Sequence, residues 1–371
     1  MNIIFDHQIF YTQRFGGISR YFFELSEGLV RQPDLNVSVV APFHVNEYLR
    51  YGNRLLVKGP YFGGQFRSAG RIRRWGRKLL LPMQYALKKN ADIVHETYYS
   101  MNPTGNGRFR ILTVYDMIHE LFEDQFRSDL ITSRAKVAAV SRADHVICIS
   151  ESTRQDLIRL LGVPRSKTSV IYLGYSLIGC DANKPATSLS NGRPYLLYVG
   201  NRGGYKNFSN FCRAFASSIA LKNVFDIVAF GGASFDSSEQ ALLSELNLTG
   251  QLHHAVGGDA LLVSHYRGAA LFVFPSLYEG FGLPPLEAMS FNCPVACSNT
   301  SSVSEIVGEA GIYFNPHSAD SMRDAMECAM NSKELCAQLI DKGKERLKMF
   351  SWDRCVSETA DVYQSVVSGF L

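Results

Sequence analysis

Short apolar runs alternate along this chain with longer segments in which apolar residues recur every three or four positions. In the first half the helical periodicity occupies residues 18–31, 79–90, 133–143 and 152–161, and the apolar runs lie at residues 2–6, 37–42, 91–96, 111–116, 145–150 and 169–173. Short strands that alternate with amphipathic helices predict a parallel, doubly wound α/β sheet covered by helices.

The second half repeats this alternation. Its apolar runs lie at residues 195–200, 225–231, 253–256, 270–274, 294–297 and 312–314. A polar stretch rich in Asn, Ser, Pro and Gly, residues 181–194, separates the halves and is typical of a linker. We therefore expect two Rossmann-like domains, residues 1–180 and 181–352, with a ligand cleft between them.

Composition places the chain among globular proteins and divides it electrostatically. Hydrophobic residues make up 46% and charged residues 19%, and no apolar run approaches the roughly 20 residues of a membrane span. The eight cysteines show no paired metal-binding spacing, and the N-terminus does not resemble a signal peptide, so we expect reduced thiols and a cytoplasmic location. Residues 1–180 hold 24 Lys and Arg against 15 Asp and Glu, whereas residues 181–371 hold 14 against 19.

The stretch from Pro275 to Met289, PSLYEGFGLPPLEAM, joins an apolar strand to a helix that starts with two prolines. Glu279 is placed on the loop at the carboxyl end of the strand, and Glu287 one turn into the helix. Gly280 and Gly282 allow the backbone to approach a ligand closely. Ligands of open α/β sheets bind at this edge, and a helix N-terminus there favours an anion such as a diphosphate.

The sequence of this stretch resembles the E-x7-E signature of glycosyltransferase family 4, formed here by Glu279 and Glu287. The resemblance implies the GT-B fold and a retaining sugar transfer from a nucleotide-sugar donor. It further implies that Glu287 holds the ribose and Glu279 the donor sugar, aided by the backbone of the segment Gly280, Phe281, Gly282 and Leu283. A C-terminal helix at about residues 353–371, opened by Ser351-Trp352-Asp353, is also similar to the family and is expected to pack on the first domain.

Two cations follow the first strand of the second half, in YVGNRGGYKN. Lys206 and Arg202 on a glycine-rich loop suit a diphosphate, whose developing charge they can neutralise. A solvated basic loop is the alternative. The family carries a similar Arg/Lys pair, and Lys206 matches its lysine more closely than Arg202 matches its arginine. Gly231, after the next strand, resembles the family's glycine turn near the nucleotide.

In the first half, Gly16 and Gly17 join the first strand to its helix. Paired glycines can form a mere tight turn, but family members carry a similar loop, which implies a contact with the donor. Asp116 and His119, in TVYDMIHE, lie near the family's T-V-H-D position, and we expect one of them to touch the reacting sugar. Tyr115 replaces the family's histidine, which puts the role of His119 in doubt.

His95 ends another strand and is a weaker candidate for lining the acceptor side. No D-x-D motif occurs anywhere in the chain, and metal-dependent transferases of the other large fold use such a motif to chelate a divalent ion. We therefore expect no metal and no cofactor. An epimerase or phosphorylase on the same scaffold, and a non-catalytic sugar-binding protein, stay open as alternatives.

The acceptor is expected to be lipid-linked or an oligosaccharide, because the sequence of the whole chain resembles those of O-antigen and capsule transferases. This favours GDP-mannose or a related GDP-sugar weakly over a UDP-sugar. The segment from Arg67 to Lys78 carries six basic residues, Trp75 and no acid. It can be an ordinary solvated helix start, or it can dock on an anionic membrane surface. The sequence thus predicts a peripheral enzyme on the inner face of the membrane, with no nucleic acid as partner.

Overall fold

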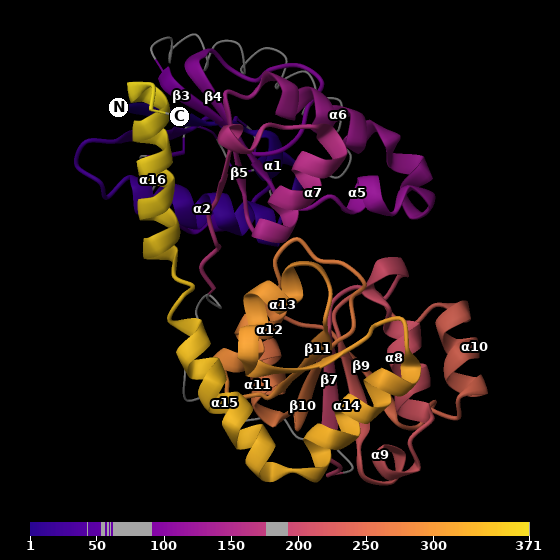
Figure 1. The fold of residues 1–371 in the computed structure, drawn as a ribbon. Coiled ribbons are helices and arrows are strands. Elements are labelled where there is room, and N and C mark those ends of the chain that lie inside the picture. The colour runs from indigo at the N-terminus through magenta and orange to yellow at the C-terminus, as the bar shows by residue number, and fades with distance from the viewer. Residues whose placement is uncertain are drawn as a thin grey trace. The chain divides into compact units, whose positions relative to one another are not determined.

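The computed structural model describes residues 1–42, 44–52, 56–57, 59, 61, 91–175 and 192–370, which fall into two compact units (Figure 1). Met1–Gly174 and Trp352–Leu371 form the first unit, and Tyr175–Ser351 forms the second. The division expected at residue 180 lies outside the described residues. The basic segment from Arg67 to Lys78 and the helix expected at residues 79–90 lie outside them as well.

The first unit contains a six-stranded parallel sheet in the order β2-β1-β3-β4-β5-β6. Its strands are β1 (Asn2–Phe5), β2 (Asn36–Val39), β3 (Ala91–Glu96), β4 (Gly107–Val114), β5 (His145–Cys148) and β6 (Thr168–Val170). Its described helices are α1 (Gln8–Thr12), α2 (Gly17–Leu29), α3 (Tyr48–Tyr51), α5 (Ile118–Leu121), α6 (Leu130–Arg142), α7 (Glu151–Leu161) and α16 (Trp352–Ser368), with short 3-10 turns η2 (Glu123–Asp129) and η3 (Arg165–Lys167).

The second unit has the same architecture, with a parallel sheet in the order β12-β11-β10-β7-β8-β9. Its strands are β7 (Tyr195–Val199), β8 (Asp226–Phe230), β9 (Leu252–Ala255), β10 (Leu271–Phe274), β11 (Val295–Ser298) and β12 (Gly311–Phe314). Its helices are α8 (Phe208–Ala216), α9 (Ile219–Val224), α10 (Ser237–Glu245), α11 (Asp259–Gly268), α12 (Leu283–Ser290), α13 (Ser301–Val307), α14 (Ala319–Asn331) and α15 (Lys333–Leu347), with 3-10 turns η4 (Gly204–Lys206) and η5 (Gly308–Ala310).

All twelve predicted strands are present, and the doubly wound α/β prediction is confirmed for both sheets. The strands form because their apolar runs are buried on both faces. β5 and β10, for example, contain only buried residues. In the second unit Phe211, Phe215 and Met326 pack with strand residues into one continuous core.

The strand order reverses between β1 and β3 in the first sheet and between β7 and β10 in the second. Chain segments leave two such neighbouring strands in opposite directions, so the loops at their carboxyl ends diverge and leave space for a ligand. The loop 200–207 follows β7 and the loop 275–282 follows β10. The fold therefore brings the two segments with the strongest sequence signals to one switch point.

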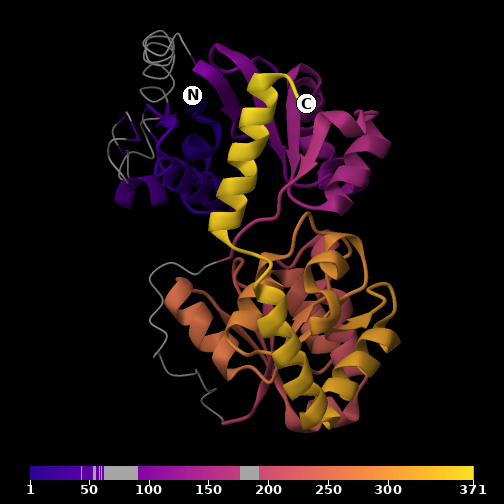
Figure 2. The same cartoon turned by 60° about the vertical axis from the view of Figure 1, so that its left-hand side comes forward.

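Helix α16 belongs to the first unit although its residues come last in the chain. Both views of the ribbon show it in yellow, running along the first unit (Figures 1 and 2). It packs against α2, where a β-carbon on Gly28 would collide with Val356. Trp352 opens the helix and lies so close to Gly174 that a β-carbon there would approach its indole ring within 2.6 Å.

One helix start differs from a pattern in the sequence. Ser152 and Gln155 are spaced like a capping box, which predicts a helix at residues 153–161 with Ser152 as its N-cap. In the structure α7 starts two residues earlier, and Ser150 is its N-cap, accepting a hydrogen bond from the Thr153 amide at 3.0 Å. Ser150 has the extended backbone that an N-cap needs, whereas Ser152 already lies inside the helix.

Candidate active site

The centre of the candidate site is an ion pair between Lys206 and Glu279. The Lys206 Nζ lies 2.7 Å from Oε1 of Glu279, and the two side chains are 21% and 12% exposed. They belong to the loops after β7 and β10, which meet at the switch point of the second sheet. The structure thus brings together two charged groups that are 73 positions apart in the chain.

Backbone and amide contacts hold these two loops against each other. The amide of Leu277 donates to the carbonyl of Tyr205 at 2.8 Å, and the Asn207 side chain donates to the carbonyl of Pro275 at 3.0 Å. Asn207 has a left-handed backbone with φ of 60°, which asparagine tolerates better than most residues. These hydrogen bonds between the two loops therefore fix the positions of Lys206 and Glu279 relative to each other.

Glu287 lies in the second turn of α12 and accepts a hydrogen bond from the hydroxyl of Tyr266 at 3.1 Å. Burial and the charge of Glu287 raise the pKa of Tyr266 well above its usual value, so Tyr266 stays a neutral donor. In the same way, burial and Glu279 raise the pKa of Tyr198, whose hydroxyl donates to the carbonyl of Asn201. Each glutamate thus has a buried tyrosine in its vicinity.

The segment that joins the two glutamates has the backbone that its glycines predict. Gly282 is the N-cap of α12 with φ of +118°, a conformation open to glycine but disfavoured for other residues. The Phe281 ring is buried and packs edge-on against Phe350, while Gly280 is buried and Leu283 partly exposed. Near this segment the Ser276 hydroxyl is buried without a hydrogen-bond partner among the residues that the structure describes.

Arg202 does not join Lys206 in this structure. Its Nε lies 2.8 Å from Glu239, and its Nη1 and Nη2 donate to the carbonyls of Gly231 and Ala233. Gly231 has φ of +96° and also accepts from His254 at 3.1 Å. The arginine therefore anchors the turn after β8, and its predicted contact with a diphosphate stays a prediction that requires a different side-chain conformation.

In the first unit, Gly16 and Gly17 lie at the start of α2, but the short helix α1 separates them from the first strand, which the sequence did not predict. A β-carbon on Gly16 would collide with the Gln13 side chain, whereas one on Gly17 would meet nothing within 4 Å. The Gln13 amide oxygen accepts from the backbone of Ser19 at 3.2 Å and so caps the helix. A side chain on Gly16 would therefore displace the capping Gln13 amide, whereas Gly17 leaves open space at the helix N-terminus.

Asp116 lies in the loop after β4 and is 28% exposed, with Oδ1 accepting the Ile118 amide at 3.1 Å. His119 is turned toward η2, where its Nε2 lies 3.4 Å from Asp129 and its ring packs on Phe126. Tyr115 is buried and donates its hydroxyl to the carbonyl of Thr97 at 3.1 Å, so it belongs to the core.

His95 is a correction to the sequence interpretation. It is completely buried, with Nδ1 2.6 Å from the hydroxyl of Tyr363 and Nε2 2.9 Å from that of Thr113. Burial lowers its pKa to about 3. His95 therefore joins α16 to the sheet and does not line an acceptor site in this unit.

Lys136 on α6 is a further charged residue of this region that was not predicted from the sequence. This lysine is completely buried, with Nζ 2.6 Å from Glu120, 3.8 Å from the Asp116 carboxylate and 2.9 Å from the Asp116 carbonyl oxygen. Its ammonium also lies 5.3 Å from the centre of the Tyr99 ring. A lysine within a helix gives no sequence signal of burial, because its amphipathic side chain normally reaches solvent. Lys136 therefore fixes the segment from Asp116 to Glu120 by contacts with both of its ends.

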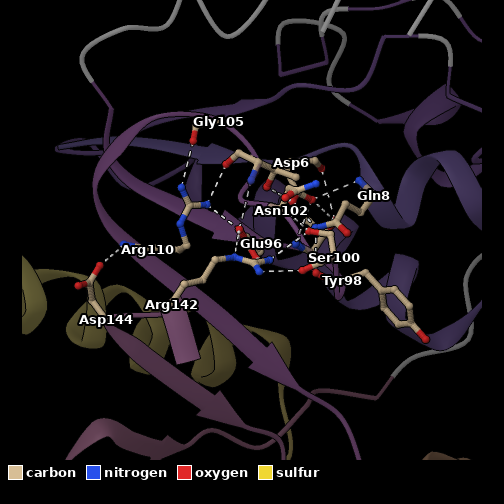
Figure 3. Close-up of polar contacts among 12 residues, drawn as sticks. Asp6, Gln8, Glu96, Tyr98, Ser100, Asn102, Gly105, Arg110, Arg142 and Asp144 are labelled. Carbon is tan, nitrogen blue, oxygen red and sulfur yellow. Dashed lines mark hydrogen bonds and ion pairs between the residues drawn. The ribbon is translucent and has the colours of Figure 1, made fainter. Parts of the chain in front are cut away.

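Two further buried acids support the loops at the first switch point (Figure 3). Glu96 accepts from Arg110 at 2.6 Å and also from Arg142, and Figure 3 shows the two guanidinium groups meeting at this carboxylate. Asp6 accepts from the backbone of Thr97 at 3.0 Å and from the Gln8 side chain at 2.7 Å. Every oxygen of these acids is used within the fold, which gives them a supporting role.

No group of His, Cys, Asp and Glu suited to a metal ion occurs in the part of the chain that the structure describes. Within that same part, no helix has the length and apolar character to cross a membrane.

Comparison with known proteins adds two domain matches. Residues 15–177 match the model described as Glycosyltransferase Family 4, and residues 181–346 match the model described as Glycosyl transferases group 1. Among curated proteins, the chain is 26% identical over 240 residues to O-antigen chain mannosyltransferase B of Escherichia coli, covering 61% of this chain and 62% of that protein. It is 27% identical over 243 residues to O-antigen chain mannosyltransferase RfbU of Salmonella typhimurium, covering 64% and 65%. The match thus spans less than two thirds of the length of these relatives.

Solved structures share the fold over the full length. The sucrose-phosphate synthase of Thermosynechococcus elongatus aligns with a TM-score of 0.77 at 18% identity, covering 99% of each chain. WaaG, a glycosyltransferase involved in lipopolysaccharide biosynthesis, aligns with a TM-score of 0.68 at 15% identity, covering 97% of this chain and 99% of WaaG. Anabaena HepE, solved with UDP and glucose, also has a TM-score of 0.68 at 15% identity, covering 98% and 99%.

Proposed function

The chain belongs to glycosyltransferase family 4 and has the GT-B fold, and we propose that it moves a sugar from a nucleotide-sugar donor to a lipid-linked or oligosaccharide acceptor. The observation that carries the proposal is the Lys206–Glu279 pair at the switch point of the second sheet. Glu287 lies in α12, the helix that follows the loop of Glu279. A cation, two carboxylates and a glycine-rich backbone are the groups that a diphosphate joined to two polyols requires.

Each group has a definite task in this proposal. Glu287 accepts hydrogen bonds from the ribose hydroxyls, and Tyr266 keeps its carboxylate oriented. Glu279 accepts from hydroxyls of the donor sugar. Lys206 stabilises the charge that develops on the diphosphate as the bond to the anomeric carbon breaks. Because Lys206 and Glu279 contact each other in the structure, a diphosphate bound to the lysine lies next to a sugar bound to the glutamate.

We propose retention of configuration by front-face transfer. The bond between the anomeric carbon and the donor phosphate oxygen breaks, and the acceptor oxygen bonds to that carbon on the same face. The acceptor proton passes to the departing phosphate oxygen. No enzyme carboxylate then needs to act as a nucleophile, in contrast to retaining hydrolases.

The diphosphate is neutralised in this proposal by Lys206 and by the start of α12, without a metal. The sequence basis is the absence of a D-x-D motif. The donor is proposed as GDP-mannose or a related GDP-sugar, since the two relatives compared above are named as O-antigen mannosyltransferases. A UDP-sugar is the competing donor, because the similarly folded HepE was solved with UDP and glucose.

The names of these relatives also favour transfer over the epimerase or phosphorylase alternatives. The deciding experiment incubates the protein with GDP-mannose, UDP-glucose or UDP-galactose and measures free nucleotide and sugar transfer to a decyl-diphosphate sugar. We expect nucleotide release that depends on Glu279 and increases when an acceptor is present. Conversion of the sugar without nucleotide release would instead support an epimerase.

A further inference from the structure

Three consecutive hydroxyl residues, Thr300, Ser301 and Ser302, follow β11, and the two serines are the first residues of α13. Their side chains do not cap the N-terminus of α13. Thr300 is the N-cap of α13, a position where threonine commonly caps an amide in the first turn, but it makes no such side-chain bond. The three hydroxyls are directed instead at the loop after β10.

The contacts follow alternate residues of that loop. Thr300 donates to the carbonyl of Leu277 at 3.0 Å, and the amide of Glu279 donates to the Ser301 hydroxyl at 2.9 Å. The Ser302 hydroxyl lies 2.8 Å from the carbonyls of both Glu279 and Phe281 and can donate to either. Both the amide and the carbonyl of Glu279 are therefore held by side chains of this triplet.

Ser301 has a left-handed backbone, with φ of +51°. A β-carbon disfavours this conformation, and such strained residues persist where the surrounding contacts require them. The strain at Ser301 accompanies the bond between its hydroxyl and the Glu279 amide. Ser302 is completely buried, so its hydroxyl has no access to water as an alternative partner.

We propose that Thr300, Ser301 and Ser302 are positioning residues, which hold the Glu279 backbone so that its carboxylate meets the donor sugar beside Lys206. The inference rests on the proposed role of Glu279. In the proposed function the ribose of the nucleotide is held by Glu287, which belongs to α12 and accepts a hydrogen bond from Tyr266, outside the triplet. Loss of a triplet hydroxyl should therefore impair sugar turnover and leave binding of the free nucleoside diphosphate largely intact.

Four variants test this proposal. Ser302→Ala and Ser301→Gly each remove one hydroxyl, and Ser301→Gly also relieves the strained backbone. Ser301→Asn retains a polar side chain and tolerates the left-handed conformation. Ser304→Ala is the matched control, because Ser304 is an exposed serine on the same helix whose hydroxyl donates to the carbonyl of Ser301 and not to the loop after β10.

The measurements are turnover of GDP-mannose and UDP-glucose, the Kd of GDP and UDP, and the Tm. We expect kcat to fall about tenfold in Ser302→Ala and Ser301→Gly, the loss of roughly one well-placed hydrogen bond. The Kd of the nucleotide should stay within about twofold, which corresponds to a small fraction of the binding energy. Ser301→Gly should match or exceed the wild-type Tm despite its lower kcat, and Ser301→Asn should recover part of the activity.

Two results would overturn the inference while wild-type turnover shows the proposed function to be correct. One is wild-type kcat in both hydroxyl-deletion variants. The other is a fall in kcat that occurs only in variants whose Tm also falls, or a fall of the same size in Ser304→Ala. Absence of turnover by the wild type with every donor would contradict the proposed function itself, and this inference with it.

Discussion

The Nδ1 of His95 lies 2.6 Å from the hydroxyl of Tyr363, and this contact joins the third strand to the last helix of the chain. The two residues are 268 positions apart, and both are completely buried in the first unit. The ring of His95 also packs on Phe5 and Phe22. An uncharged histidine is therefore built into the core that unites the two chain segments of this unit.

This burial predicts a pH dependence of stability. Burial lowers the pKa of His95 to about 3, whereas an unfolded histidine has a pKa of about 6.5. The unfolded state thus binds more protons between these values. The contribution of His95 is fully present above about pH 6.5 and is lost as the pH falls toward 3, with a slope of up to about 1.4 kcal/mol per pH unit.

Urea unfolding of the wild type and of His95→Gln between pH 7.5 and 4.5 measures this slope. The variant should be less stable at pH 7.5 and should lose less stability on acidification. Replacement of the exposed His317 by Gln is the control and should reproduce the wild-type slope. Parallel pH profiles of His95→Gln and the wild type would contradict a neutral buried His95.

The proposed roles of Glu287 and Lys206 predict different kinetic defects. Glu287→Ala should raise the donor KM about tenfold with little change in kcat, because a ribose contact is equally strong in ground and transition states. Lys206→Ala should lower kcat about a hundredfold, since its charge acts on the leaving diphosphate. Steady-state kinetics with the exposed Lys344→Ala as control measures both effects. Equal kcat losses with unchanged KM in the two variants would contradict these assignments.

Chelation tests the proposed neutralisation of the diphosphate by Lys206. Dialysis against EDTA should leave sugar turnover within about twofold of the untreated enzyme, because the cationic loop replaces a metal in this proposal. The assay is nucleotide release before and after chelation, with and without added Mg²⁺ or Mn²⁺. Activity that disappears with EDTA and returns with either ion would show that a metal neutralises the donor.

Lys136→Met should destabilise the first unit strongly, by roughly 3–5 kcal/mol, because it leaves Glu120, whose side chain is only 10% exposed, without its cation 2.6 Å away. Unfolding by urea measures the loss. Lys167→Met is the matched control, since Lys167 also donates to α6, to the carbonyls of Val140 and Ser141 at 3.2 and 3.3 Å, but is partly exposed.

A double-mutant cycle separates this ion pair from packing. Combining Lys136→Met with Glu120→Gln should cost clearly less than the sum of the single changes, because the second change removes the uncompensated carboxylate. Strictly additive losses would show that Lys136 contributes through packing alone.

The basic segment from Arg67 to Lys78 carries a prediction from the sequence alone. We expect salt-sensitive binding to anionic liposomes and none to neutral ones, because each basic residue near an anionic leaflet contributes about 1 kcal/mol. Replacing Arg71, Arg73 and Arg74, together with Arg77, by Ser should abolish sedimentation with the liposomes and spare donor hydrolysis. Continued binding of this variant, or no binding of the wild type, would identify the segment as an ordinary solvated surface.

The sequence by itself determined the local elements of this protein. The twelve strands follow from apolar runs bounded by polar and glycine-rich turns, which are readable over a few residues. The E-x7-E segment is equally local, since Gly282 and the two prolines specify a turn and then a helix start. These signals placed Glu279 and Glu287 correctly on their loop and helix.

Only the tertiary structure decided which charged groups meet. Lys206 pairs with Glu279, Arg202 with Glu239, and Lys136 with Glu120, over 73, 37 and 16 positions respectively. Sequence pattern reports the periodicity of burial along one element, whereas ion pairing depends on which elements the sheet order makes neighbours and on the direction each side chain takes. The same limit applies to Thr300, Ser301 and Ser302, which look like an ordinary helix start until β11 is placed beside β10.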